Sequence, residues 1–272
     1  MVLPKLTTVV AALILAVGAG PALARDICTL VADPVSRTVL LADGDCESRV
    51  TPASTFKIPL AVIGFDAGLL LSRSEPVMTF KPGEPDWGGA PWKGDVDPAG
   101  WMRHSVVWYS QRLTRQLGAE RLSDYLSKLG FGNADFSGDP GFDNGLERAW
   151  ISSSLKISPL EQAGFTAALI EGQLPVSAAA MSGAISLVES AGTEADWTLW
   201  GKTGSAYPRR ADRSFDYAKG WGWYVGWAEK DGKRLVFARL AQDEARHEKS
   251  GGLRARDALL AQWPALVARL GL

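Results

Sequence analysis

The chain has 272 residues, a formal net charge of −1 and a hydrophobic fraction of 46%, the profile of an ordinary globular protein. A charge so close to balance gives no electrostatic case for binding nucleic acid or an anionic membrane surface. The sequence contains no internal repeat, low-complexity stretch or flexible linker, which favours a single domain rather than a string of modules.

The first 24 residues have the organisation of an export signal. Lys5 supplies a positive charge, residues 8–20 form an apolar run, and Ala22-Leu23-Ala24 is a small-residue cleavage site. The run is short for a membrane span, and no later segment is long and apolar enough to be one. We therefore predict a signal peptide over 1–24 and an exported mature chain over 25–272, without membrane attachment and periplasmic if the source is Gram-negative. A retained N-terminal anchor is the alternative.

Two cysteines, Cys28 and Cys46, are the only ones in the chain. They bracket a predicted hairpin with strands over 27–33 and 38–42, and their placement about its turn is roughly symmetric. In an oxidising compartment this arrangement predicts a disulfide, with two free buried thiols as the alternative. Two cysteines without a nearby histidine do not indicate a metal site, and we predict none.

Residues 54–57 place the hydroxyl of Ser54 and the amine of Lys57 three positions apart. In a helical or 3₁₀ turn these positions share a face, and Pro59 suits the start of a helix over 58–64. A serine becomes a good nucleophile when a base takes its proton. Lysine can be that base only if burial lowers its pKa or its nitrogen is chemically altered. The motif is weak alone, because residues 153–156 repeat it.

The middle of the chain is predicted to be mainly helical. Residues 76–95 are an exception: they are rich in Pro, Gly and Trp, and Trp87 and Trp92 either line a groove or pack under a loop. Asp97-Pro98 begins a helix that carries Ser105 and continues to Gly118. Further helices are expected over 120–129, from the capping box at 158–161 to residue 172, and from 177 to about 191.

The last third of the chain has strand character. Strands are predicted over 197–200, 221–229 and 233–240, with Asp231-Gly232 as a hairpin turn, followed by a helix from about 252 that ends at Pro264. Strands from both ends most simply form one antiparallel sheet. The predicted fold is α+β, with a sheet lobe (25–58 and 192–272) flanked by helices and packed against a mainly helical lobe (59–191).

A histidine-based triad has little support in this sequence. His104 and His247 are the only histidines. His104 adjoins Ser105, so on a helix the two side chains point to different faces. His247 lies in a charged stretch, 243–249, of solvated character. The sequence therefore favours a lysine as the base over a Ser-His-acid arrangement.

A third short motif, Lys202-Thr203-Gly204, lies on a predicted strand, where Gly204 would let a ligand approach the backbone closely. The order of Ser-x-x-Lys, a helical serine and Lys-Thr-Gly is the layout of serine enzymes that acylate on β-lactams. Six motifs occur in order, at 54–57, 105–107, 131–133, 150–162, 202–204 and 252–254. On these motifs the whole mature chain resembles the class D (oxacillinase-type) β-lactamases, in the fold of penicillin-recognising serine enzymes.

The resemblance implies a role for each matched residue of the helical region. Ser54 would open the lactam ring, and Lys57, carboxylated by carbon dioxide to N6-carboxylysine, would be general base for acylation and deacylation. Trp150 would hydrogen-bond that carbamate, Ser105 would relay a proton to the leaving nitrogen, and Val107 would pack near the modified lysine. A carbamate needs an uncharged amine, and apolar residues around these motifs could supply the dry pocket. No cofactor is implied beyond carbon dioxide or bicarbonate.

The resemblance also assigns substrate contacts to the C-terminal third. Lys202 and Thr203 would shape the local field and touch the substrate, and the backbone N–H groups of Ser54 and Ser205 would form the oxyanion hole. Arg254 would pair with the substrate carboxylate, because a guanidinium binds a carboxylate through two parallel hydrogen bonds. The implied partners are small β-lactams, and the sequence carries no signal for an oligomeric state or a preferred β-lactam.

One position departs from the family, which commonly has tyrosine where this chain has Phe131. The missing hydroxyl affects any hydrogen bond from that loop and the expected sensitivity to halide ions. Two other functions share the motifs: a penicillin-sensing module that holds its acyl adduct, and a peptidoglycan transpeptidase or carboxypeptidase. The first needs a transmembrane connection and the second usually has an anchor or further domains, so the sequence favours a secreted β-lactamase.

Overall fold

The computed structural model describes residues 24–272, so the predicted signal peptide lies outside the described residues except for Ala24. Within that range no helix is long and apolar enough to cross a membrane. The strands are β1 (Arg25–Ala32), β2 (Val39–Gly44), β3 (Met78–Thr79), β4 (Asp95–Val96), β5 (Ser190–Glu194), β6 (Trp197–Ala206), β7 (Trp221–Lys230) and β8 (Lys233–Gln242). The helices are η1 (Ala53–Phe56), α1 (Lys57–Asp66), η2 (Ala90–Trp92), α2 (Pro98–His104), α3 (Val107–Leu117), α4 (Ala119–Lys128), α5 (Gly145–Arg148), α6 (Pro159–Ile170), α7 (Ala178–Leu187) and α8 (Gly251–Arg269).

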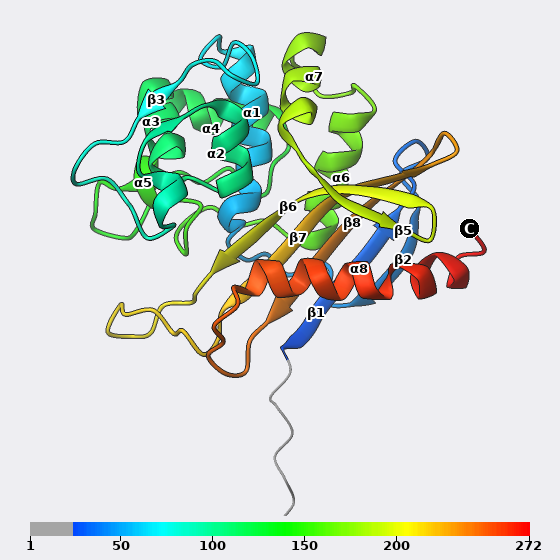
Figure 1. Cartoon of the computed structure of the whole chain (residues 1–272). Helices are drawn as coiled ribbons and strands as arrows, with labels where there is room; N and C mark the ends of the chain where they lie inside the picture. The colour runs from blue at the N-terminus through cyan, green and yellow to red at the C-terminus, as the bar shows by residue number, and fades with distance from the viewer. Residues whose placement is uncertain (1–23) are drawn as a thin grey trace, which may run out of the picture.

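Six strands form one antiparallel sheet in the order β2-β1-β8-β7-β6-β5. Strand β1 pairs with β8, with Leu30 opposite Ala238, so the first and the last strand of the chain are neighbours inside the sheet. Figure 1 shows α8 (orange to red) lying across one face and helices α1–α5 (cyan to green) gathered at one side of the sheet. The predicted α+β fold, with a sheet built from both ends of the chain, is confirmed.

Alternating side chains bury both faces of this sheet. On β7, Trp223 and Val225 belong to the large core that includes α1, α3 and α6, whereas Tyr224 belongs to a second core that includes α8. Phe237 and Trp263 pack together in this second core with ring centroids 5.6 Å apart. A strand has a side-chain period of two, so its even and odd residues meet different layers. The same alternation decides which side chains of β6 face the helical lobe and which face α8.

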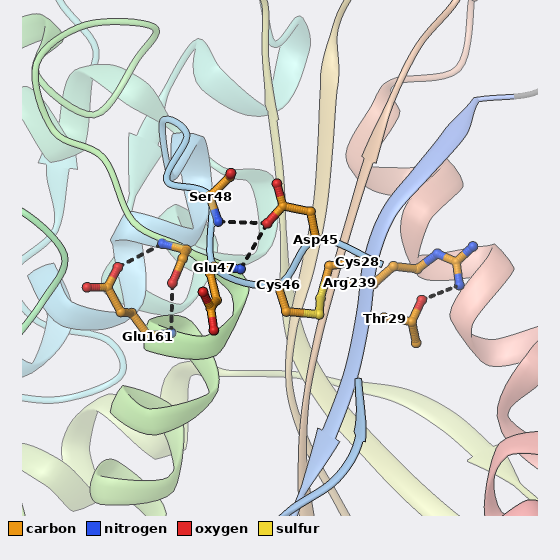
Figure 2. The surroundings of a disulfide bond; sticks show 9 residues. Cys28, Thr29, Asp45, Cys46, Glu47, Ser48, Glu161 and Arg239 are labelled. Atoms are coloured by element: carbon orange, nitrogen blue, oxygen red, sulfur yellow. Dashed lines mark hydrogen bonds between the residues drawn. A yellow bond between two sulfur atoms is a disulfide. The ribbon is translucent and has the colours of Figure 1, made fainter. Parts of the chain in front are cut away.

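The predicted disulfide between Cys28 and Cys46 is confirmed. It joins β1 to the segment that follows β2, with a Cα–Cα distance of 5.1 Å and both residues buried. Figure 2 shows the bridge beside Asp45, whose carboxylate accepts hydrogen bonds from the backbone N–H groups of Glu47 and Ser48. The bridge therefore fixes the start of the segment that leads to η1.

Three local predictions are corrected by the structure. The helix expected from 97 to 118 is two helices, because Ser105 adopts a left-handed backbone (φ 59°, ψ 36°) between α2 and α3. The final helix runs through Pro264, where packing of α8 on the sheet outweighs the loss of one hydrogen bond. The helix expected from 177 to about 191 ends at Leu187, and β5 follows it. This strand was not predicted, since its sequence lacks branched and aromatic residues other than Thr193.

Replacing both cysteines by serine should lower the free energy of unfolding by about 3 kcal/mol, the value expected for closing a loop of this length. The cysteines are 18 positions apart. Chemical denaturation followed by circular dichroism measures the change, and reductant should shift only the wild-type curve. Equal midpoints for the two proteins would show that the bridge contributes little.

Candidate active site

Ser54 lies on η1, and Lys57 begins α1. The backbone N–H of Lys57 donates to the carbonyl oxygens of Ser54 and Thr55, so the two catalytic candidates share one tight turn. The hydroxyl of Thr55 donates to Pro52 O at 2.8 Å and accepts from Gln162 Nε2 at 2.7 Å. These bonds satisfy a buried polar side chain and hold the turn. Gln162 on α6 is therefore a supporting residue, to which sequence reasoning gave no specific role.

A cavity of about 620 Å³ opens in front of this turn. Seven of the predicted site residues line it: Ser54, Ser105, Val107, Lys202, Thr203, Gly204 and Ser205. Three predicted residues, Lys57, Trp150 and Arg254, are not among its lining residues. The structure thus brings η1, the α2–α3 junction and β6 to one cavity, with Lys57 and Trp150 buried.

The amine of Lys57 is fully buried and has no hydrogen-bond partner among residues 24–272. Burial, and secondarily the positive charge of Lys202, hold the pKa of Lys57 well below its usual range. The ring of Trp150 stacks on Phe56, with centroids 5.3 Å apart, and on Phe136, with centroids 6.0 Å apart. These surroundings favour the neutral form of the amine, which can act as a nucleophile or a base.

Lys202 points from β6 toward the helices. Its Nζ donates to Ser105 Oγ and to Thr203 O, both at 3.2 Å. Burial lowers the pKa of Lys202 to about 8, an effect that Glu189 opposes. The left-handed backbone of Ser105 is part of this contact, because it presents the hydroxyl at the junction of two helices. A serine inside a continuous helix would have bonded its own backbone instead.

Gly204 permits the close approach of β6 to η1. A Cβ atom at this position would lie 2.9 Å from Pro52 O and 3.2 Å from the backbone nitrogen of Thr55. On the same strand, Ser205 Oγ accepts the backbone N–H of Gly252 at 2.8 Å, which ties the start of α8 to the cavity. The Lys-Thr-Gly motif therefore needs its glycine for packing as well as for ligand access.

Phe131, the departure from the family pattern, is fully buried. Its ring lies 6.2 Å from Phe56 and packs edge-on against Phe165 at 5.2 Å. Phe131 therefore supports the wall behind Lys57 through apolar contact alone. No hydroxyl is available there to bind an anion or to position Lys57.

Arg254 lies outside the cavity lining. Its guanidinium forms an ion pair with the buried carboxylate of Asp243 and donates to Lys249 O at 3.0 Å. The cationic residues that line the cavity are instead Arg103, Lys202 and Lys249. The sequence offered no local motif for either Arg103 or Lys249. Arg103 reaches the cavity from α2, and Lys249 reaches it from the loop before α8.

Two further features of the cavity bear on the sequence analysis. Trp87 and Trp92 both line it, and their rings lie 5.5 Å apart. His104 also lines it, but in the described part of the chain its side chain has no hydrogen bond to Ser54 or to a carboxylate. Residues 24–272 contain no group of three or more His, Cys, Asp or Glu side chains that could hold a metal ion.

Comparisons with known proteins agree with this geometry. Residues 27–263 match the family described as penicillin binding protein transpeptidase domain. The chain is 41% identical to β-lactamase OXA-9 of Klebsiella pneumoniae over 241 residues, 88% of each protein. It is 30% identical to regulatory protein BlaR1 of Bacillus licheniformis over 207 residues, 73% of this chain and 30% of the regulator.

A solved structure, the class D β-lactamase OXA-427, is similar with a TM-score of 0.82 and 43% sequence identity, covering 89% of this chain and 99% of that one. The family match spans nearly the whole described chain, and the OXA-9 relative is similar over the same extent. The serine-lysine turn, the Lys-Thr-Gly strand and these similarities together show that the chain belongs to the class D serine β-lactamases.

Proposed function

We propose that this protein hydrolyses β-lactam antibiotics through a serine acyl-enzyme, with carboxylated Lys57 as general base in both halves of the reaction. One observation carries the proposal: the unpartnered, fully buried amine of Lys57 on the same turn as Ser54, which lines the cavity. Export through a signal peptide over 1–24 would place this enzyme where it meets β-lactams.

The residues present fit a carboxylated lysine. A neutral amine adds to carbon dioxide, forming an N–C bond and releasing one proton, and the low pKa of Lys57 keeps the amine neutral. The resulting anion would turn the unfavourable Lys57–Lys202 interaction into an attraction. Trp150, which is buried and stacked on Phe56, would supply a hydrogen bond to the carbamate from its indole N–H. The carboxyl group on Lys57 would supply the base, a role for which neither His104 nor His247 is placed.

The acylation step follows from these positions. Ser54 Oγ loses its proton to Lys57 in its carboxylated form and bonds to the lactam carbonyl carbon. Backbone N–H groups of Ser54 and Ser205 would hold the developing oxyanion. The C–N bond then breaks, and Ser105, bonded to Lys202, relays to the leaving nitrogen the proton that carboxylated Lys57 took from Ser54, which regenerates the base. In deacylation the base takes a proton from water, whose oxygen bonds to the ester carbon. The C–O bond to Ser54 Oγ then breaks, and the proton returns to that oxygen.

Substrate recognition would combine charge and apolar surface. Lys249 and Lys202 line the cavity together with Thr203, and we propose that they bind the substrate carboxylate. Arg254, to which the family resemblance gives this role, would instead hold the loop through Lys249 O. Trp87, with 66% of its surface exposed, offers an apolar wall for a substrate side chain.

A penicillin-sensing module is the second candidate, favoured by the 30% identity to BlaR1. Turnover separates the two functions. We expect many cycles of chromogenic cephalosporin hydrolysis per enzyme molecule, and Ser54→Ala should abolish both turnover and covalent labelling by a penicillin. A stoichiometric burst that then stalls would favour the sensor.

The pH profile should depend on bicarbonate. Removing bicarbonate should lower kcat roughly 10²-fold, the typical contribution of a general base. The loss should be strongest at mildly acidic pH, where the carboxyl group of the carbamate is lost. Activity should fall on the alkaline side as Lys202 loses its proton near its pKa of about 8. Carboxylation places a negative charge nearby, so bicarbonate should move this alkaline limb upward. A bicarbonate-independent profile would favour a neutral lysine as the base.

Lys249→Ala should raise the KM for benzylpenicillin roughly tenfold with a smaller change in kcat, because it removes a charged partner of the carboxylate. Arg254→Ala should raise KM less and should mainly lower the unfolding midpoint, since it leaves Asp243 buried without its partner. Lys219→Ala, an exposed lysine before β7, is the matched control and should change neither quantity. If Arg254→Ala raised KM more than Lys249→Ala does, Arg254 and not Lys249 would be the residue that binds the substrate carboxylate.

A further inference from the structure

Thr51, three positions before Ser54, connects the nucleophile turn to the loop that carries Trp150. The residue is 3% exposed. Its Oγ1 donates to Trp150 O at 2.8 Å and accepts the backbone N–H of Ser152 at 3.0 Å. Its carbonyl oxygen accepts a hydrogen bond from Trp223 Nε1, near the start of β7, at 2.9 Å. One residue therefore links η1, the Trp150 loop and the sheet.

The loop on the other side of these bonds has an unfavourable backbone. Ser152 adopts a positive φ of 57°, which costs a residue other than glycine of order 1 kcal/mol or more. The hydroxyl of Thr51 satisfies the Ser152 N–H in that conformation, and Ser152 Oγ accepts the backbone N–H of Tyr207 at 3.2 Å. The turn at 150–152 is thus held from η1 and from the end of β6.

Apolar packing alone does not fix the position of Trp150 along this wall. Its ring stacks on Phe56 and on Phe136, and such contacts tolerate sliding because dispersion and hydrophobic burial are weakly directional. Hydrogen bonds have narrow distance and angle requirements. Backbone hydrogen bonds between Val50 and Ile157 join the same two segments further along the chain, and the two bonds of the Thr51 hydroxyl are the ones that reach the 150–152 turn itself.

We infer that Thr51 is a positioning residue for the base: its hydroxyl places the Trp150 indole N–H where it can bind carboxylated Lys57. The inference rests on the proposed function. Because Thr51 is joined by the chain to the turn of Ser54 and by hydrogen bonds to Trp150, it fixes the two walls of the buried lysine site relative to each other. A shift of about 1 Å between them would weaken the hydrogen bond that stabilises the base.

The test compares Thr51→Val, which keeps the shape and removes the hydroxyl, with Thr51→Ser, which keeps the hydroxyl. Thr29→Val is the matched control: Thr29 is a buried threonine on β1 whose Oγ1 accepts a hydrogen bond from Arg239, away from the cavity. Thr51→Ala removes the same hydroxyl if the valine variant folds poorly. The measurements are the bicarbonate concentration for half-maximal activity, the ¹³C NMR signal of the carbamate in ¹³C-bicarbonate, acyl-enzyme accumulation by mass spectrometry, and the unfolding midpoint.

Thr51→Val should need roughly tenfold more bicarbonate, show a weaker carbamate signal and accumulate acyl-enzyme, because it loses two buried hydrogen bonds beside the base. Thr51→Ser should restore the wild-type bicarbonate response. Thr29→Val should lower only the unfolding midpoint. If Thr51→Val behaves like Thr29→Val, with an unchanged bicarbonate response, Thr51 is merely structural and the inference is wrong. A wild-type enzyme that shows neither carbamate signal nor bicarbonate response would instead overturn the carboxylated base, and this inference with it.

Discussion

The mechanism that we propose for this protein depends on keeping one amine out of water. Lys57 is fully buried, without a hydrogen-bond partner among the described residues, and its pKa is held low by that burial. Burying an amine without a hydrogen-bond partner costs free energy whether the amine is charged or neutral. A fold keeps such an amine only where the surrounding residues hold it away from water. Here the aromatic wall around Trp150 and the hydrogen-bonded turn of Ser54 do so together.

The sheet forms the side of the cavity opposite the turn of Ser54. The strand register and the alternation of side chains decide which residues of β6 lie there. Pairing of β6 with β7 places Lys202 opposite Val225, and alternation turns Lys202 toward the helices and Ser105. Gly204 then lets the strand approach η1 to a distance that a side chain would block. The strand and the turn come from segments about 150 positions apart in sequence, so only the folded sheet can bring them together.

Charge around the cavity is distributed differently from what the family pattern implies. Asp243, on the loop after β8, is buried and forms an ion pair with the guanidinium of Arg254. Lys249 lines the cavity. A guanidinium already paired in a buried site loses much of its value for a ligand, because the ligand must displace the existing carboxylate. The neighbouring Lys249 carries no such buried partner, although its amine also contacts Asp257 at the surface.

The sequence by itself determined the turn of Ser54 and Lys57, the antiparallel sheet, the disulfide and most helix starts, because turn residues, capping boxes and alternation are local signals. Tertiary structure decided the rest. No local signal marks the left-handed break at Ser105 or the continuation of α8 through Pro264, since long-range packing holds both. The direction of Arg254 and the bonds of Thr51 likewise depend on partners far along the chain, which only the fold brings within reach.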